Sequence, residues 1–123
     1  MFREKPFILL VEDDGPLRKV LARYLQATGY MVLQASSFRE AVDSMAIKPA
    51  IVILDINLPD ATGWDVAEWL RSLSQDVPVL MMSAYPRPGA KQLNKVGARA
   101  FLAKPFPVAE LLRLVQQYVP LSH

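Results

Sequence analysis

The chain has 123 residues, which is enough for one domain with a single hydrophobic core, and we expect one domain over residues 1–123. It has no cysteine, which excludes disulfide bonds and thiolate metal sites, and no apolar run approaches the roughly 18 to 20 residues that a membrane span needs. The net charge of +2 is too weak to indicate direct nucleic-acid binding, so we expect a cytoplasmic domain that binds neither nucleic acid nor membrane.

In the first half of the chain, short apolar runs alternate with segments of helical periodicity. Residues 7–11 and 30–33 are predicted strands, and a helical stripe follows each of them. The first stripe contains Leu17, Val20, Leu21, Tyr24 and Leu25, and the second contains Phe38, Ala41, Val42, Met45 and Ala46. Pro16 suits a first helical turn, Gly29 follows a helix end, and Ser37 with Glu40 matches a capping box.

The second half repeats this alternation. Residues 51–54, 79–82 and 100–102 are predicted strands. One helical stripe contains Val66, Trp69, Leu70 and Leu73, and another contains Val108, Leu111, Leu112 and Val115 after Pro107, which suits a first helical turn. Residues 90–96 are weakly patterned, and the prolines at positions 86 and 88 predict that the fourth helix starts late and is short.

Five strand and helix pairs in alternation predict an α/β protein. Parallel strands joined by right-handed crossovers form an open sheet with helices on both faces, so we expect a (βα)5 doubly wound fold of the flavodoxin type. In such a sheet ligands bind beyond the carboxyl ends of the strands. The residues at these ends are Glu12, Asp13, Asp55, Ser83 and Lys104.

This set of side chains favours phosphoryl transfer assisted by a metal. Clustered carboxylates repel each other unless a cation joins them, and Mg²⁺ suits a shallow, solvent-open site with few protein ligands. Asp55 would be the nucleophile, while Lys104 and Ser83 would stabilise the phosphoryl oxygens. Asp14 could be a third metal ligand, but its place before Gly15 and Pro16 favours helix capping.

Four segments of the chain resemble the receiver domains of two-component response regulators. These are the first strand with the acidic pair (residues 8–14), the phosphoacceptor segment (residues 53–59 with Gly63), the fourth strand with its hydroxyl residue (residues 79–84), and the fifth strand with the lysine (residues 101–106). Each fragment alone is a weak signal. Together, in this order and at these spacings, they are a strong one, and the resemblance covers the whole chain.

The resemblance implies the strand order 2-1-3-4-5 and a set of site roles. Mg²⁺, with Mn²⁺ able to substitute, would be bound by Glu12 and Asp13, one of them through water, by Asp55, and by the backbone carbonyl of Asn57. Ser83 and Phe101 would form the switch, although Phe101 could alternatively be a simple core residue, buried by the alternation of a short edge strand. Lys104 and Pro105 would be joined by a cis peptide bond that directs the ammonium group into the site.

The resemblance also implies partners and an output. A sensor histidine kinase or a histidine phosphotransfer protein would phosphorylate Asp55, and the domain would catalyse only its own phosphorylation and dephosphorylation. Phe101 would turn inward as Ser83 moves, changing the surface of the fourth helix, fifth strand and fifth helix. That surface would bind a downstream protein or a second copy. Its basic residues Lys91, Lys95 and Arg99 could alternatively be an ordinary solvated face.

Three other functions are weaker hypotheses. A degenerate receiver that only binds proteins is the main alternative, but all five site residues are present. A phosphohydrolase would need a second acid where Asn57 stands, as well as a cap over its substrate. A nucleotide-binding protein would need a glycine-rich phosphate motif, which the sequence lacks.

Tyr85 lies two residues beyond Ser83. We expect its side chain to hinder the approach of water to a phosphoryl group on Asp55, so that the phosphoryl group would be lost slowly.

Overall fold

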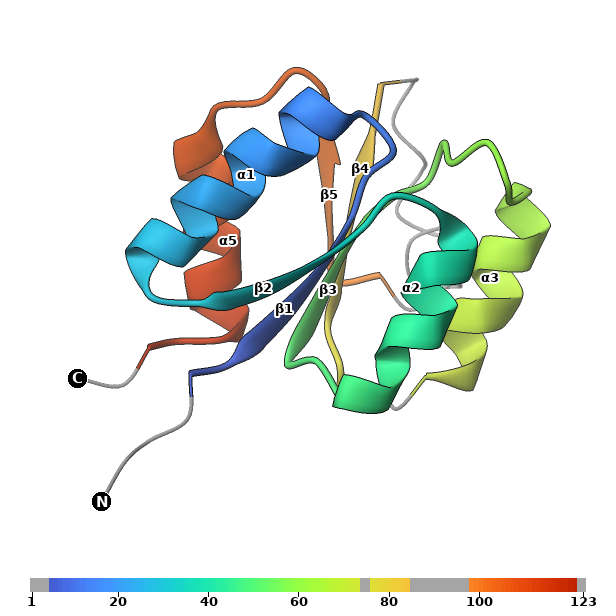
Figure 1. Ribbon diagram of the computed structural model, residues 1–123, viewed down its shortest axis with the longest axis horizontal. Helices are drawn as coiled ribbons and strands as arrows, with labels where there is room; N and C mark the ends of the chain where they lie inside the picture. Colours follow the sequence, from blue (N-terminus) through green and yellow to red (C-terminus); the bar gives the residue numbers. More distant parts are fainter. Residues whose placement is uncertain (1–4, 74–75, 85–97, 122–123) are drawn as a thin grey trace.

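The computed structural model describes residues 5–73, 76–84 and 98–121, and these form one parallel sheet flanked by helices (Figure 1). The strands are β1 (Phe7–Val11), β2 (Met31–Ala35), β3 (Ile51–Asp55), β4 (Val79–Ser83) and β5 (Ala100–Ala103), and the helices are α1 (Gly15–Thr28), α2 (Phe38–Ser44), η1 (Met45–Ile47), α3 (Gly63–Ser72) and α5 (Val108–Tyr118). All four strand pairings are parallel, in the order β2-β1-β3-β4-β5. The predicted fold class and strand order are confirmed.

The sheet has a hydrophobic core on each face. Along β1, Ile8 belongs to the core that includes residues of α1 and α5, while Leu9 belongs to the core that includes residues of α2 and α3. The two pairs of helices cover opposite faces of the sheet (Figure 1). All residues of β3 and β4 are buried, which explains why their sequences are continuous apolar runs. Each fully buried Leu or Ile contributes about 2 kcal/mol by leaving water, so these two strands anchor the residues that follow them.

Side-chain caps fix the N-termini of α1 and α3. Asp14 caps α1, because its carboxylate accepts a hydrogen bond from the backbone N–H of Leu17 at 3.1 Å, as the sequence predicted. At its other end Gly29 adopts φ 124°, a conformation that favours glycine. Thr62 and Asp65 form a reciprocal capping box at the start of α3 that the sequence analysis did not identify.

The capping box predicted at Ser37 is only half formed. Ser37 accepts a hydrogen bond from the backbone N–H of Glu40, but the Glu40 carboxylate accepts from Ser36 instead of returning to Ser37. A carboxylate from another part of the chain completes the helix end. Asp60, in the loop after β3, accepts hydrogen bonds from the N–H groups of Phe38 at 2.9 Å and Arg39 at 3.1 Å.

Two of the predicted helical stripes, those on α1 and α2, contain exposed residues. On α1, Val20 and Tyr24 are 48% and 50% exposed, and Ala22 is buried instead. On α2 only Ala41 is buried, and the helix ends at Ser44 before a single 3₁₀ turn. These helices cover the sheet margin near β2, so a narrower stripe suffices to reach the core. Pro107 is the N-cap of α5 and not part of its first turn.

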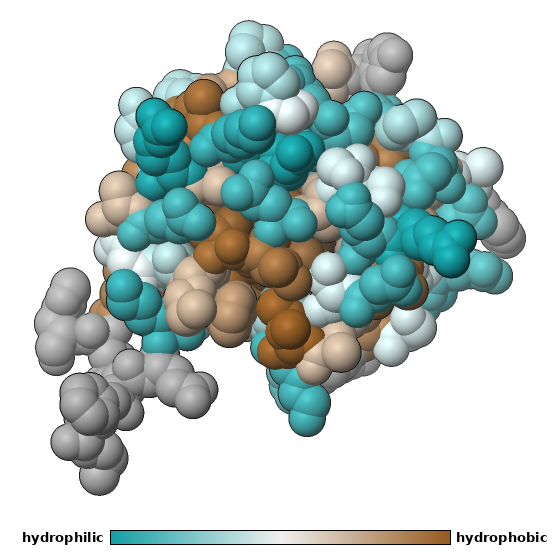
Figure 2. Space-filling model, in the orientation of Figure 1, coloured by the Kyte–Doolittle hydropathy of each residue, from teal (hydrophilic) through white to brown (hydrophobic). Residues whose placement is uncertain are grey.

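Strand β2 begins and ends later than predicted. Within the described part of the chain it pairs only with β1, and the register that matches Phe7–Val11 to Met31–Ala35 carries the strand past the polar Gln34. As an edge strand it is less buried than the others, and Met31 is 42% exposed. Figure 2 shows hydrophobic surface near the middle of this view, where β2 runs between α1 and α2.

The remaining predictions concern segments outside the sheet. The weakly patterned segment and the expected fourth helix fall in residues 85–97, outside the described residues. Among the helices of the described residues, none has the length and apolar character needed to cross a membrane. Near the end of α5, the buried Tyr30 donates a hydrogen bond from its hydroxyl to the carbonyl of Val119 at 2.6 Å, which ties this helix to the start of β2.

Candidate functional site

The candidate site lies at the carboxyl end of the sheet, where three loops converge. Glu12 follows β1, Asp55 is the last residue of β3, and Lys104 follows β5. The parallel register aligns the last residues of neighbouring strands, since Val11 pairs with Leu54 and Asp55 pairs with Met82. The sheet therefore brings together side chains that are far apart in sequence, as expected for an open parallel sheet.

Lys104 links the two buried carboxylates of the site. Its ammonium nitrogen donates a hydrogen bond to Oδ2 of Asp55 at 2.9 Å and another to Oε1 of Glu12. Burial lowers the pKa of Lys104, but the hydrogen bonds to Glu12 and Asp55 outweigh this and raise its pKa above the ordinary value. The lysine therefore stays cationic and neutralises one of the negative charges below it.

Glu12 is more deeply buried than the sequence analysis expected. It is 0% exposed and Asp55 is 4% exposed, so the expectation of a shallow site open to solvent is wrong for these two side chains. Burial and the neighbouring Asp55 raise the pKa of Glu12 to about 7, although the hydrogen bond from Lys104 lowers it.

The acidic residues form a donor set that fits a hard divalent cation. Carboxylate oxygens of Glu12, Asp13 and Asp55 all lie within 4.8 Å of one another, and Asp13 is exposed at the mouth of the group. Mg²⁺ binds oxygen ligands, commonly takes one or two carboxylates, and keeps several waters. One exposed and two buried carboxylates therefore offer protein ligands on one side and access for water on the other.

Asn57 makes two contacts in the site that the sequence did not reveal. Its backbone N–H donates to Oδ1 of Asp55 at 2.8 Å, and its side-chain oxygen accepts a hydrogen bond from the hydroxyl of Ser83 at 2.7 Å. Ser83 is the last residue of β4 and is 1% exposed. Only the backbone carbonyl of Asn57 was expected in the site, because side-chain orientation in a loop leaves no periodic signal.

Arg18 is a second residue that the sequence analysis did not identify. From the second turn of α1 its guanidinium donates a hydrogen bond to the backbone carbonyl of Glu12 at 2.8 Å and another to Oε1 of Gln34 at 3.2 Å. The N–H of Glu12 donates to the carbonyl of Ala35 at 3.0 Å. Glu12 is therefore held by hydrogen bonds to both its backbone N–H and its backbone carbonyl. In the sequence, the only sign of this role for Arg18 was a basic residue one helical turn after Asp14.

The other residues singled out from the sequence have different outcomes. The peptide bond between Lys104 and Pro105 is cis, the conformation that the family resemblance implied. Phe101 is 8% exposed and packs in the core on the α2 and α3 side of the sheet. Tyr85 lies outside the described residues, and so do the basic residues at positions 91 and 95.

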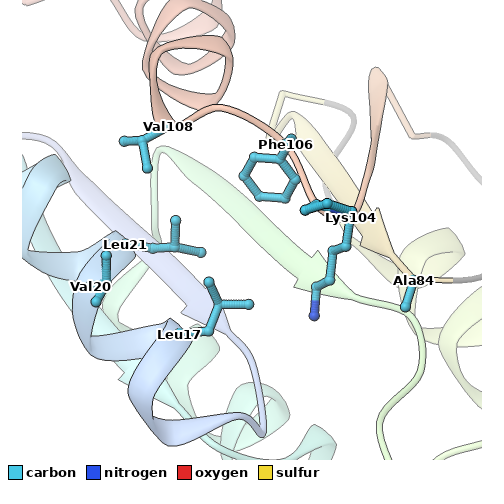
Figure 3. Close-up of a pocket in the computed structure, with 8 residues that line it drawn as sticks. Leu17, Val20, Leu21, Ala84, Lys104, Phe106 and Val108 are labelled. Carbon is cyan, nitrogen blue, oxygen red and sulfur yellow. The ribbon is translucent and has the colours of Figure 1, made fainter.

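An apolar pocket of about 380 Å³ adjoins the site on the α1 side (Figure 3). Leu17 and Leu21 project into it from α1, and Phe106 faces them from the loop between β5 and α5. The lining consists of Leu17, Val20, Leu21, Ala84, Lys104, Pro105, Phe106 and Val108. The stem of Lys104 therefore separates an apolar surface from the carboxylates that its ammonium group contacts.

The family model of the response regulator receiver domain matches residues 8–116. The chain belongs to this family. As a receiver it is a signalling domain of the type found in two-component systems, and the matched region contains every residue of the site described above.

Individual relatives agree with this assignment. Response regulator MprA of Mycolicibacterium vanbaalenii is 38% identical over 107 residues, 85% of this chain and 46% of that protein. Sporulation initiation phosphotransferase F of Bacillus subtilis is 31% identical over 99% of this chain and 98% of its own length. The response regulator TrrA of Thermotoga maritima, solved in complex with Mg²⁺ and BeF, gives a TM-score of 0.80 at 29% identity, covering 93% of this chain and 99% of that one. The chain thus spans about half the length of MprA and nearly all of the phosphotransferase.

Proposed function

We propose that this receiver accepts a phosphoryl group on Asp55 from a sensor histidine kinase or a histidine phosphotransfer protein in the cytoplasm. The observation that carries the proposal is the place of the Asp55 carboxylate, at the carboxyl end of β3 between the Lys104 ammonium and the acidic pair. Membership of the receiver family supports the same chemistry. The domain would catalyse only its own phosphorylation and dephosphorylation.

In this reaction an oxygen of Asp55 forms a bond to phosphorus while the bond from phosphorus to the donor's imidazole nitrogen breaks. The bonding electron pair returns to the imidazole, and the product is an acyl phosphate. The ammonium group of Lys104 lies 2.9 Å from Oδ2 of Asp55, close enough to interact with a phosphoryl oxygen once the group is transferred. The backbone N–H of Asn57 holds Oδ1 and so orients the carboxylate.

Glu12, Asp13, Asp55 and the backbone carbonyl of Asn57 would hold Mg²⁺, and Mn²⁺ would be able to replace it. The ion supplies positive charge to the phosphoryl oxygens when it is bound. The closeness of the carboxylate oxygens supports this assignment, and the structure of TrrA with Mg²⁺ and BeF is a precedent in a relative. Arg18 and Lys104 keep Glu12 in the orientation that the donor set needs.

The apolar pocket beside Lys104 is the proposed docking place of the phosphodonor. A donor histidine must come within bonding distance of Asp55, so the donor protein has to cover the surface next to it. Val20 is 48% exposed at the rim of the pocket, and Leu17 and Phe106 line its interior. These residues would receive an apolar helix of the kinase or phosphotransfer protein.

The proposed output passes through Ser83 and Phe101, which lie on the adjacent strands β4 and β5. A phosphoryl group on Asp55 would draw the Ser83 hydroxyl toward it, which shifts the end of β4. Phe101 is already buried, so its proposed response is a change of packing within the core. The surface of the fourth helix, β5 and α5 would then bind a downstream protein or a second copy.

Mass spectrometry of the intact protein tests the proposed function. With acetyl phosphate and Mg²⁺ the parent protein is expected to gain one phosphoryl group, and Asp55→Asn is expected to gain none. Asp43→Asn, an exposed substitution on α2, is the matched control and should behave as the parent. Full labelling of Asp55→Asn, or equal labelling in a chelator, would disprove the proposal. An unlabelled parent would favour the degenerate receiver that only binds proteins.

A further inference from the structure

The hydrogen bond between Ser83 and Asn57 has a consequence for phosphorylation. The hydroxyl of Ser83 donates to the side-chain oxygen of Asn57 at 2.7 Å, a favourable length for a hydrogen bond between two oxygen atoms. Asn57 is itself fixed, because its backbone N–H donates to Asp55 at 2.8 Å. The phosphoacceptor, the asparagine and the serine therefore form one short chain of hydrogen bonds at the end of the sheet.

A serine hydroxyl has a single proton to donate. In the proposed function, on which this inference rests, the Ser83 hydroxyl donates that proton to an oxygen of the phosphoryl group on Asp55. It cannot at the same time donate it to Asn57. We propose that the side chain of Asn57 is a latch that competes with the phosphoryl group for the Ser83 hydroxyl and so holds the domain in its unphosphorylated arrangement.

The unequal exposure of the three residues favours this role over a purely structural bond. Ser83 is 1% exposed and Asp55 is 4% exposed, so the hydroxyl finds its acceptor within the protein. Asn57 is exposed on the loop after β3, and its side chain can turn into solvent when the serine is released. Breaking the latch therefore leaves a solvated amide, whereas an unpaired buried hydroxyl would be costly.

The size of the effect follows from competition. The Ser83 hydroxyl is either bonded to Asn57 or free. A ligand that needs the free hydroxyl binds more weakly in proportion to the ratio of the bonded to the free state. The net free energy of one hydrogen bond between neutral groups changes an equilibrium constant by a factor of about five. Removing the Asn57 side chain should therefore tighten the binding of a phosphoryl mimic about fivefold. The backbone carbonyl proposed as a Mg²⁺ ligand is retained in an alanine variant, and saturating Mg²⁺ in the test keeps the metal site filled in every variant.

A double-mutant cycle tests the latch. Beryllofluoride affinity in saturating Mg²⁺ is measured by calorimetry for the parent, Asn57→Ala, Ser83→Ala and the double variant, with Asp43→Ala as a surface control. We expect Asn57→Ala to bind about fivefold more tightly than the parent, and the same substitution to have no effect in the Ser83→Ala background. A merely structural bond would lower the melting temperature without this coupling.

The outcomes separate the latch from the proposed function. If the parent binds beryllofluoride and Asn57→Ala binds it no more tightly, the latch is wrong and the phosphoacceptor function stands. Equal tightening in both serine backgrounds also overturns the latch, because the effect would not pass through the hydroxyl. If the parent does not bind beryllofluoride in Mg²⁺, the proposed function and the latch both fail.

Discussion

The ammonium nitrogen of Lys104 lies 2.9 Å from Oδ2 of Asp55, although the two residues are 49 positions apart in the chain. Strands β4 and β5 lie between them in sequence. Because β3, β4 and β5 are parallel neighbours in the sheet, Lys104, which follows β5, lies at the same edge as the carboxyl end of β3. The same ammonium group also contacts Glu12, so one cation is shared by two buried carboxylates. We therefore expect the stability of the domain to depend on pH and on metal.

The first prediction concerns Glu12, whose pKa is raised from 4.5 to about 7. Between these values the folded, metal-free protein binds more protons than the unfolded chain, so its free energy of unfolding falls as the pH rises. The loss from pH 5 to pH 8 should be roughly 2 to 3 kcal/mol. Urea unfolding in a chelator measures it. Glu12→Gln has no proton to lose, so its free energy of unfolding should depend much less on pH. If the free energy of unfolding of the parent does not change between pH 5 and pH 8, the prediction is contradicted.

Mg²⁺ should raise the melting temperature of the parent, and Asp13→Asn should stabilise the metal-free protein at pH 8. When ionised, the three carboxylates contribute −3 and Lys104 contributes +1, and two like charges 4 Å apart repel by about 4 kcal/mol at an effective dielectric of 20. Solvent around the exposed Asp13 reduces the gain from its neutralisation to about 1 kcal/mol. A ligand at 100 times its Kd adds about 2.7 kcal/mol.

Melting curves with Mg²⁺ and with chelator, for both proteins, test this pair of expectations. Asp43→Asn removes an exposed carboxylate away from the site and serves as the control. The metal-dependent rise should be smaller for Asp13→Asn than for the control. If Asp13→Asn is less stable than the parent in chelator, the carboxylates do not repel each other as the geometry indicates.

Arg18→Gln should weaken Mg²⁺ binding about tenfold, the low end of the range for residues that support metal ligands. The substitution removes the hydrogen bond to the Glu12 carbonyl and leaves all proposed ligands in place. Arg23→Gln changes an exposed arginine on the same helix and should bind Mg²⁺ as the parent does. Calorimetric titration compares them, and equal affinities for the two variants would show that Arg18 does not position Glu12.

Val20→Glu should reduce phosphotransfer from a histidine kinase about tenfold, because it places a charge at the rim of the proposed apolar docking pocket. Labelling by acetyl phosphate, which needs no docking, should be unchanged. The control is Val42→Glu, which alters a side chain of similar exposure, 41% against 48%, on α2. Radiolabel transfer from a purified kinase measures both variants. A Val20→Glu protein that accepts the label at the parent rate would place the donor elsewhere.

Position along the chain and polarity were sufficient to predict which residues meet at the sheet edge. Glu12, Asp55 and Lys104 each end or follow an apolar run, and parallel pairing brings such positions together. The roles assigned to them remain proposals. Burial was harder to predict: the helical stripe on α1 included Val20 and Tyr24, which are about half exposed, because periodicity gives the direction of a face but not its width.

Contacts made by loop side chains could not be predicted. The oxygen of Asn57 reaches Ser83 only because the backbone turns after β3, and no repeat in the sequence encodes that turn. Asp60 caps a helix that precedes it by more than twenty residues. By contrast, the capping box of Thr62 and Asp65 was visible in the sequence, with aspartate in the position where glutamate or glutamine is usual.

The two hydrogen bonds from α2 to Asp60 also constrain how this domain can vary. Asp55 is fixed by the sheet at one end of the intervening segment, and Asp60 is fixed at the other end by the N–H groups of Phe38 and Arg39. An inserted or deleted residue between them would detach the carboxylate from the helix as well as change the cost of closing the loop. Exposed side chains such as Pro59 carry no such restriction. In this loop, evolution can therefore change residue identity more readily than length.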